Sequence, residues 1–99
     1  MSYRYVFHAA AQQDYEDAVI WYAEKSLQAA ENFVTAVDQT LILICEYPRR
    51  WRNEYKKFRE LGVKKYPYTI IYTIEEPQQL IVITSIYHHK RNSKKKYRK

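Results

Sequence analysis

After a short N-terminal segment, the spacing of apolar and polar positions changes along the chain from helical to strand-like. Between residues 9 and 48 the apolar residues recur at helical spacing, whereas residues 66–87 alternate as in β-strands. The helical part divides near Ser26, a suitable N-cap for a second helix that Pro48 ends. Because the link between the two helices is very short, we expect them to form an antiparallel hairpin.

The clearest strand signal is a β-hairpin in the second half. Residues 68–74 alternate between two faces, Pro77 lies in a polar turn, and residues 80–87 form a second run rich in β-branched side chains. Apolar residues occur on both faces of this hairpin. We therefore expect it to lie in the middle of a sheet rather than at the edge.

Two shorter strands complete the predicted sheet. Residues 3–7 (YRYVF) are aromatic and β-branched, and a strand over residues 56–65 follows a polar loop at 49–55. The order β-α-α-β-β-β predicts an α+β fold, with the helical hairpin on one face of an antiparallel sheet and the other face left for a partner. We expect residues 1–91 to form one domain and residues 92–99 a basic tail that is mobile when free.

Charge is distributed unevenly over the 99 residues, whose formal net charge is +6. Residues 1–47 hold two Lys or Arg against seven Asp or Glu, and residues 48–99 hold fifteen against four. Seven cations and no acid fall within residues 88–99. This asymmetry favours a polyanionic partner for the second half, such as RNA, DNA or an acidic protein segment, over a merely solubilising surface.

The rest of the composition excludes several classes of protein. Hydrophobic residues make up 46% of the chain, which is typical of a folded domain. Cys45 is the single cysteine, so the chain has no internal disulfide or cysteine-based metal cluster, which suits a reducing cytosol. No apolar run approaches the length needed to cross a bilayer. We expect a cytoplasmic protein that uses no metal, no cofactor and no membrane.

Several short segments, none of them specific alone, follow one another in a recognisable order. They are YRYVF, AxxDYEDAVIWYAEKS, AAENFVTAV, EYP, FREL, YPYTIIY and IYHHKRN. With them the chain resembles the RelE/ParE superfamily, toxins of type II toxin–antitoxin systems that are often described as plasmid stabilisation proteins. The resemblance implies the fold derived above, growth inhibition, and a cognate antitoxin that neutralises the toxin by wrapping a segment around it. RelE-like members cleave mRNA in the ribosomal A site, and ParE-like members inhibit DNA gyrase.

The resemblance also implies candidate residues for a metal-independent endoribonuclease. Such cleavage requires an activated 2′-hydroxyl and stabilised charge on the scissile phosphate. His88 stands at the histidine position of the family's H-x-x-R strand end and would act as acid or base. Arg91 would contact phosphate, and Tyr97 would stack on a base or exchange a proton. Strand alternation directs His88 and His89 to opposite faces, so at most one reaches the site.

Further cations are candidate contacts for the nucleic-acid substrate, namely Arg59, Lys64, Lys65, Lys94 and Lys95. For Arg59 the plainer alternative is an ion pair with Glu54 or Glu60, and for the tail lysines it is simple solvation. Trp21, Tyr22, Tyr68 and Tyr72 are predicted to be core aromatics rather than platforms for stacked bases.

Three activities remain open at this stage. A ribosome-dependent mRNA endonuclease, with the ribosome and mRNA as partners, is favoured by His88, Arg91 and Tyr97. A non-enzymatic gyrase inhibitor is favoured by Thr69, which stands where RelE-like enzymes carry an arginine, and by the YPYTIIY form, which is more typical of ParE-like members. The third possibility is a degenerate member that only binds its antitoxin. The residues at the strand end and in the tail favour the nuclease.

Overall fold

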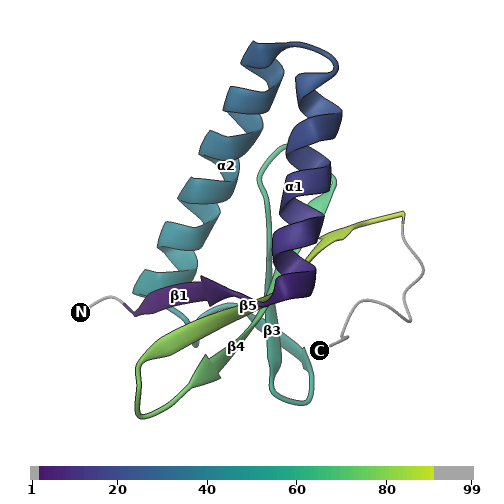
Figure 1. Cartoon of the computed structure of the whole chain (residues 1–99). Helices are drawn as coiled ribbons and strands as arrows, with labels where there is room; N and C mark the ends of the chain where they lie inside the picture. The colour runs from purple at the N-terminus through teal and green to yellow at the C-terminus, as the bar shows by residue number, and fades with distance from the viewer. Residues whose placement is uncertain (1–2, 91–99) are drawn as a thin grey trace.

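The computed structural model describes residues 3–90, which form two helices and one five-stranded sheet (Figure 1). The elements in chain order are β1 (Arg4–Phe7), α1 (Ala9–Ala23), α2 (Leu27–Glu46), β2 (Arg52–Tyr55), β3 (Phe58–Gly62), β4 (Tyr68–Glu75) and β5 (Leu80–His88). The α+β class and the opening order β-α-α-β are confirmed. The predicted tail at residues 92–99 lies outside the described residues.

The sheet is mixed rather than wholly antiparallel. Its strand order is β1-β5-β4-β3-β2, and β1 runs parallel to β5 while the other neighbours are antiparallel. The prediction of an antiparallel sheet is therefore wrong at β1. No tight turn joins β1 to β5, because the helices and three strands lie between them, so local sequence does not fix their relative direction. The predicted central position of the β4–β5 hairpin is confirmed.

The predicted loop at residues 49–55 contains a strand that the sequence pattern did not reveal. β2 pairs antiparallel with β3, and the Asn53 side chain donates to the carbonyls of Lys56 and Phe58, at 3.0 and 2.9 Å. Lys56 occupies the left-handed region with φ 50°. The predicted strand over 56–65 is accordingly shorter, because its first residues form the β2–β3 turn.

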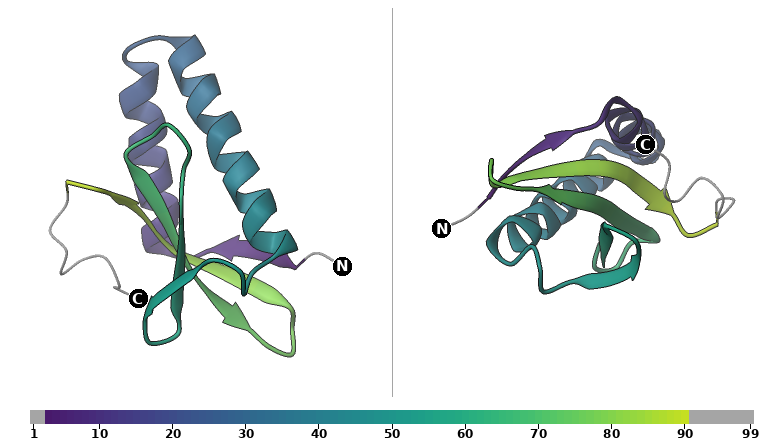
Figure 2. Two further views of the ribbon diagram at one scale, coloured as in Figure 1. Left: turned by 180° about the vertical axis from the view of Figure 1, so that it is seen from behind. Right: turned by 90° about the horizontal axis from the view of Figure 1, so that it is seen from below.

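Side-chain caps define where the two helices begin. Nδ1 of His8 accepts the Ala10 N–H at 3.1 Å and caps α1, and the Ser26 hydroxyl accepts the Ala29 N–H at 2.9 Å, as predicted, to cap α2. α2 ends at Glu46, before the proline. Within residues 3–90, neither helix has the length and apolar character to span a bilayer. The connection between α1 and α2 near Ser26 forms the end of the helical hairpin, and this end projects away from β1 (Figures 1 and 2).

The main core lies between α2 and one face of the sheet. The buried apolar stripe of α2 consists of Ala30, Phe33, Val37, Leu41, Ile44 and Cys45. The last five of these share one cluster with Ile70, Tyr72, Ile81, Ile83 and Ile86. Tyr72 donates its hydroxyl proton to the Pro48 carbonyl at 2.6 Å, and burial raises the pKa of this phenol. A smaller cluster of Phe58, Ile71 and Tyr87 lies on the opposite face.

A β-bulge in β5 changes which residues face the helices. Ile71 pairs with Ser85 but Tyr72 pairs with Ile83, so Thr84 is an extra residue in β5. Before the bulge the odd-numbered Ile83 belongs to the helix-side core, and after it the even-numbered Ile86 does. The alternation of β5 is thus inverted over its last residues.

Asp14 of α1 holds β5 just after this bulge. β1 ends at Phe7, which pairs with Ile83, so β5 continues without a strand on that side. The buried Asp14 carboxylate accepts the Ile86 N–H at 3.0 Å and the Ser85 hydroxyl at 3.3 Å. α1 therefore takes the place of a neighbouring strand and fixes the end of β5.

Candidate functional site

The end of β5 presents His88 to the side of the sheet that the helices cover. The imidazole packs edge-on against Tyr68, with ring centroids 4.9 Å apart and planes at 88°. Its Nδ1 atom accepts the Lys90 N–H at 3.0 Å, so in the neutral ring the proton resides on Nε2. These two contacts fix the orientation of His88, which is half-buried.

His89 lies on the other side of the sheet. Its Nε2 atom is 2.9 Å from the Thr69 hydroxyl, and its N–H donates to the Pro67 carbonyl at 3.0 Å. The two imidazoles are separated, as strand alternation predicts. The bulge at Thr84 determines which of them faces the helices, because without it the odd-numbered His89 would take that place.

His88 lines a hollow of about 340 Å³ that lies between α1, the start of β4 and the end of β5. We call this hollow the His88 pocket. Its other lining residues are Asp17, Ala18, Trp21, Tyr22, Pro67 and Tyr68. Burial, together with the neighbouring Tyr68 and Tyr66, raises the pKa of Tyr22, so its hydroxyl is neutral at physiological pH. The pocket therefore combines aromatic walls with a carboxylate and an imidazole.

Arg59 supports the chain between α2 and β2, and its predicted contact with nucleic acid stays a prediction. Its Nη1 atom donates to the carbonyls of Arg49 and Trp51, at 3.0 and 2.9 Å. Its strand partner is Tyr72, whose side chain belongs to the helix-side core. The Glu60 carboxylate lies 3.9 Å from the Arg52 guanidinium.

Lys64 and Lys65 lie in the β3–β4 turn, outside the His88 pocket. Both are exposed and line a separate groove of about 550 Å³ beside α2, together with Tyr66. The Tyr66 ring contacts Tyr22 edge-to-face at 5.5 Å, and Tyr22 lines the His88 pocket. These aromatic rings connect the walls of the two hollows. Arg91, Lys94, Lys95 and Tyr97 lie outside the described residues, so their predicted roles stay predictions.

Trp21 was predicted to be in the core, and this prediction is wrong. The indole is 51% exposed, and its neighbour Ile20 is 57% exposed. The helical stripe of α1 contains Ala11, Ala18 and Tyr22 but leaves positions 20 and 21 outside it. This departure from the stripe was the signal that these apolar side chains face outward.

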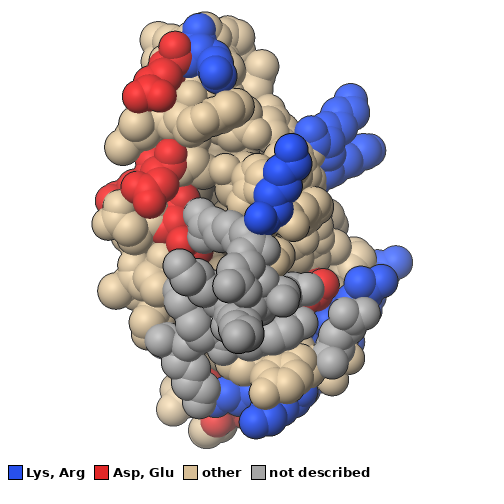
Figure 3. Space-filling view, turned by 90° about the vertical axis from the view of Figure 1, so that its right-hand side faces the viewer, with Lys and Arg blue, Asp and Glu red and all other residues tan. Residues whose placement is uncertain are grey.

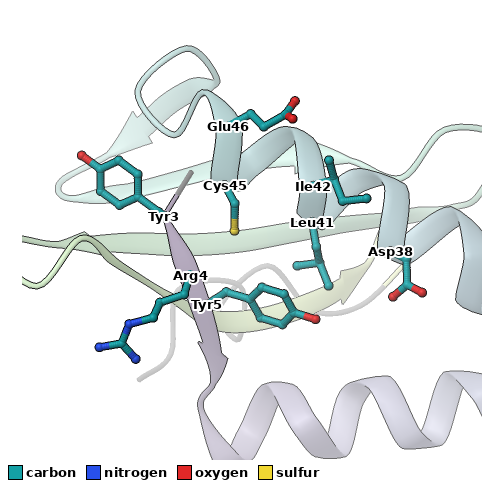
Figure 4. Close-up of a pocket in the computed structure, with 8 residues that line it drawn as sticks. All are labelled: Tyr3, Arg4, Tyr5, Asp38, Leu41, Ile42, Cys45 and Glu46. Carbon is teal, nitrogen blue, oxygen red and sulfur yellow. The ribbon is translucent and has the colours of Figure 1, made fainter. Parts of the chain in front are cut away.

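A further hollow is a groove between β1 and α2, and it contains none of the predicted site residues (Figure 4). Its volume is about 590 Å³, and its lining residues are Tyr3, Arg4, Tyr5, Asp38, Leu41, Ile42, Cys45 and Glu46. The Cys45 thiol lies at the buried base, where burial raises its pKa and makes it a poor nucleophile. Most of the surface that this groove offers is apolar.

The charged residues follow the division between helices and strands. On the face shown in Figure 3, most Asp and Glu atoms lie at the upper left and most Lys and Arg atoms lie along the right and the lower edge, although a few charges of each sign stand among the other. This distribution agrees with the acidic residues 1–47 and the basic residues 48–99. Among residues 3–90, no three His, Cys, Asp or Glu side chains are placed to hold a metal ion.

The fold is that of small bacterial toxins of toxin–antitoxin systems. The chromosomal ParDE system from P. aeruginosa matches with a TM-score of 0.60 and 16% identity, covering 89% of this chain and 96% of that one. The isolated E. coli RelE toxin also matches with a TM-score of 0.60, at 12% identity, covering 96% and 93% respectively. No curated protein sequence matches the chain.

The family model described as the ParE toxin of the type II toxin–antitoxin system parDE matches residues 5–93. The chain therefore belongs to the ParE toxin family. It is the toxin component of a type II system, and toxins of this kind pair with an antitoxin.

Proposed function

We propose that this toxin arrests growth by binding and inhibiting a protein target, DNA gyrase, rather than by cutting RNA. The observation that carries this proposal is a group of exposed apolar side chains where the two helices meet. Ile20 and Trp21 in the last turn of α1, and the 72% exposed Leu27 in the first turn of α2, form what we call the hairpin-end patch. Large exposed apolar side chains gathered at one end of a small domain are typical of a protein-binding surface.

The state of two candidate nuclease positions supports the same proposal. Arg59 donates to two backbone carbonyls and so contributes to the fold. Thr69, which stands where RelE-like enzymes carry an arginine, is paired with His89. Thr69 carries no guanidinium, and one nitrogen of the Arg59 guanidinium is already engaged by backbone carbonyls, so both positions offer less to a phosphate than a free arginine would.

The first experiment is gyrase supercoiling in the presence of the purified chain. Ile20→Ser combined with Leu27→Ser should weaken inhibition by about tenfold, because anchor residues carry most of the energy of a protein interface. Ile42→Ser is the matched control, since Ile42 is 56% exposed on α2 but lies in the β1–α2 groove. The proposal would be contradicted if the wild-type chain left supercoiling unaffected. It would also be contradicted if Ile42→Ser weakened inhibition as much as the Ile20→Ser/Leu27→Ser variant does.

Ribosome-dependent mRNA cleavage is the second candidate, and it is favoured by the fixed orientation of His88 and by the seven cations that follow His88 in the sequence. In this case a ribosome programmed with mRNA should yield cut transcripts. The double variant Arg91→Ala/Tyr97→Phe should abolish the cuts, because it removes the phosphate contact and the proton-exchanging phenol. Pulse labelling in cells separates the two mechanisms, since nuclease action stops protein synthesis first and gyrase inhibition induces DNA-damage signalling.

The antitoxin should bind the basic side of the toxin through an acidic or amphipathic segment. The exposed Lys64 and Lys65 supply part of that charge, and their interaction with an acidic segment is screened by salt. Affinity that falls as salt is added supports this contact. Affinity that does not change with salt would assign the main contact to an apolar surface, such as the β1–α2 groove.

A further inference from the structure

The walls of the His88 pocket are mostly rings, and the carboxylate among its described lining residues is not accompanied by a Lys or Arg, as the carboxylates of the other hollows are. Trp21, Tyr22, Tyr68 and His88 supply four rings, and Asp17 is the only Asp, Glu, Lys or Arg among the lining residues. Its floor includes Ala18, which is buried and small. This chemistry suits a planar, positively charged group more than an anion.

Asp17 and Trp21 lie one helical turn apart, and therefore on the same face of α1. One oxygen of Asp17, Oδ1, accepts a hydrogen bond from the Gln13 side chain at 2.8 Å, which restrains the carboxylate. The Tyr22 ring packs edge-on against the indole, with centroids 4.9 Å apart and planes at 87°. A carboxylate beside a restrained indole offers both an ion pair and a stacking surface.

Trp21 already attracts a cation within the protein. The Lys25 ammonium, from the turn that follows α1, lies 4.5 Å from the centroid of its ring. This contact is a cation–π interaction, and it demonstrates that the indole face is accessible to a positive group. It also means that Lys25 would repel and compete with any second cation that entered the pocket.

We propose that the His88 pocket binds the guanidinium group of an arginine side chain from a protein partner. The identity of the partner as a protein rests on the proposed function, whereas the pocket's chemistry does not. A guanidinium pairs with a carboxylate through two parallel hydrogen bonds and stacks on aromatic faces, which an ammonium does less well. Asp17 provides the carboxylate, Trp21 the stacking surface, and the pocket is adjacent to the hairpin-end patch.

The test uses the full chain, labelled so that the indole N–H groups are seen by NMR. N-acetyl-arginine methylamide should shift the Trp21 signal in a saturable way, and N-acetyl-lysine methylamide should bind more weakly. Trp51 is an internal control, because its indole N–H donates to the Leu43 carbonyl away from the pocket. Asp17→Asn should weaken arginine binding by about fivefold, and Lys25→Ala should strengthen it by about twofold.

Asp38→Asn is the matched control, because Asp38 is an exposed acid in the β1–α2 groove. Guanosine monophosphate distinguishes a nucleobase pocket from an arginine pocket. If the nucleotide binds, with Lys25→Ala weakening it and Asp17→Asn strengthening it, the arginine assignment is overturned. No response to either probe also overturns it, as does equal weakening by Asp17→Asn and Asp38→Asn.

Gyrase assays keep this inference separate from the proposed function. If Asp17→Asn abolishes probe binding but inhibits supercoiling as the wild type does, the pocket is not a target contact and the proposed function stands. If the probe binds as expected but wild-type toxin leaves gyrase active, the pocket is supported and the identity of the target is wrong.

Discussion

Removing the Asp14 carboxylate should destabilise the protein more than removing an exposed side chain would. Asp14 is 5% exposed and accepts the Ile86 N–H at 3.0 Å and the Ser85 hydroxyl at 3.3 Å. In Asp14→Ala the buried Ile86 N–H loses this charged acceptor. We expect a loss of about 2–4 kcal/mol in the free energy of unfolding, because a hydrogen bond to a charged group is lost and a buried donor is left unpaired.

Two further variants divide this loss into its parts. Asp14→Asn keeps an acceptor oxygen of similar position, and we expect it to cost about 1 kcal/mol. Ser85→Ala removes only the weaker of the two bonds and should cost about 1 kcal/mol or less. In the double variant Asp14→Ala/Ser85→Ala, the serine substitution should add almost nothing, because its partner is already absent.

Equilibrium unfolding in urea measures these differences, and the slope of the transition should stay constant. Amide exchange at Ile86 provides a local readout, since this N–H should exchange faster in Asp14→Ala than in Ser85→Ala. A loss below about 0.5 kcal/mol in Asp14→Ala would refute the reasoning, because a surface substitution costs no more than that. Unchanged exchange at Ile86 would refute it equally.

Three other predictions concern side-chain contacts with the connecting segments of the fold. Tyr72→Phe should lower the free energy of unfolding by about 1 kcal/mol, because the hydrogen bond to the Pro48 carbonyl is lost. The stability of the wild-type protein should fall as the pH rises above the ordinary phenol pKa, because burial raises the pKa of Tyr72 in the folded state only. The hydrogen bond from the Tyr3 hydroxyl, together with a neighbouring arginine, lowers the pKa of Glu76. The free energy of unfolding, measured at decreasing pH, should therefore include a contribution that is present above the ordinary glutamate pKa and is lost as the pH falls through the lowered pKa. Glu76→Gln should remove that pH dependence. Arg59→Ala should lower the midpoint of unfolding in urea, because two loop carbonyls lose their donor. An unchanged midpoint combined with a loss of activity would instead support a role of Arg59 in substrate binding.

Local sequence was sufficient for the elements whose residues contact one another within a short stretch. The helical hairpin was predictable because Ser26 caps α2 and a proline follows it. The β4–β5 hairpin was predictable from strand alternation around a short turn. β2 was not, because three of its four residues are polar and give no apolar alternation, and its pairing depends on Asn53 and the turn that follows.

The candidate site was less predictable because its geometry comes from distant residues. The spacing around Arg59 could not reveal that its guanidinium turns under the chain leaving α2. The outward position of Trp21 was readable from the stripe of α1, but its approach to His88 joins residues from opposite ends of the sequence. Contacts of this kind depend on register and packing, which no local pattern specifies.

Asp14 links the bulge in β5 to the chemistry of the His88 pocket. Thr84 is the extra residue that turns His88, rather than His89, toward the helices, and its hydroxyl donates to the Ile71 carbonyl at 3.1 Å. Asp14 then binds the N–H two residues further on, which fixes the inverted alternation of β5. On the same helix, one turn later, Asp17 lines the pocket that His88 closes. One buried carboxylate thus positions both walls of the pocket, so its removal should loosen arginine binding there while leaving the β1–α2 groove intact.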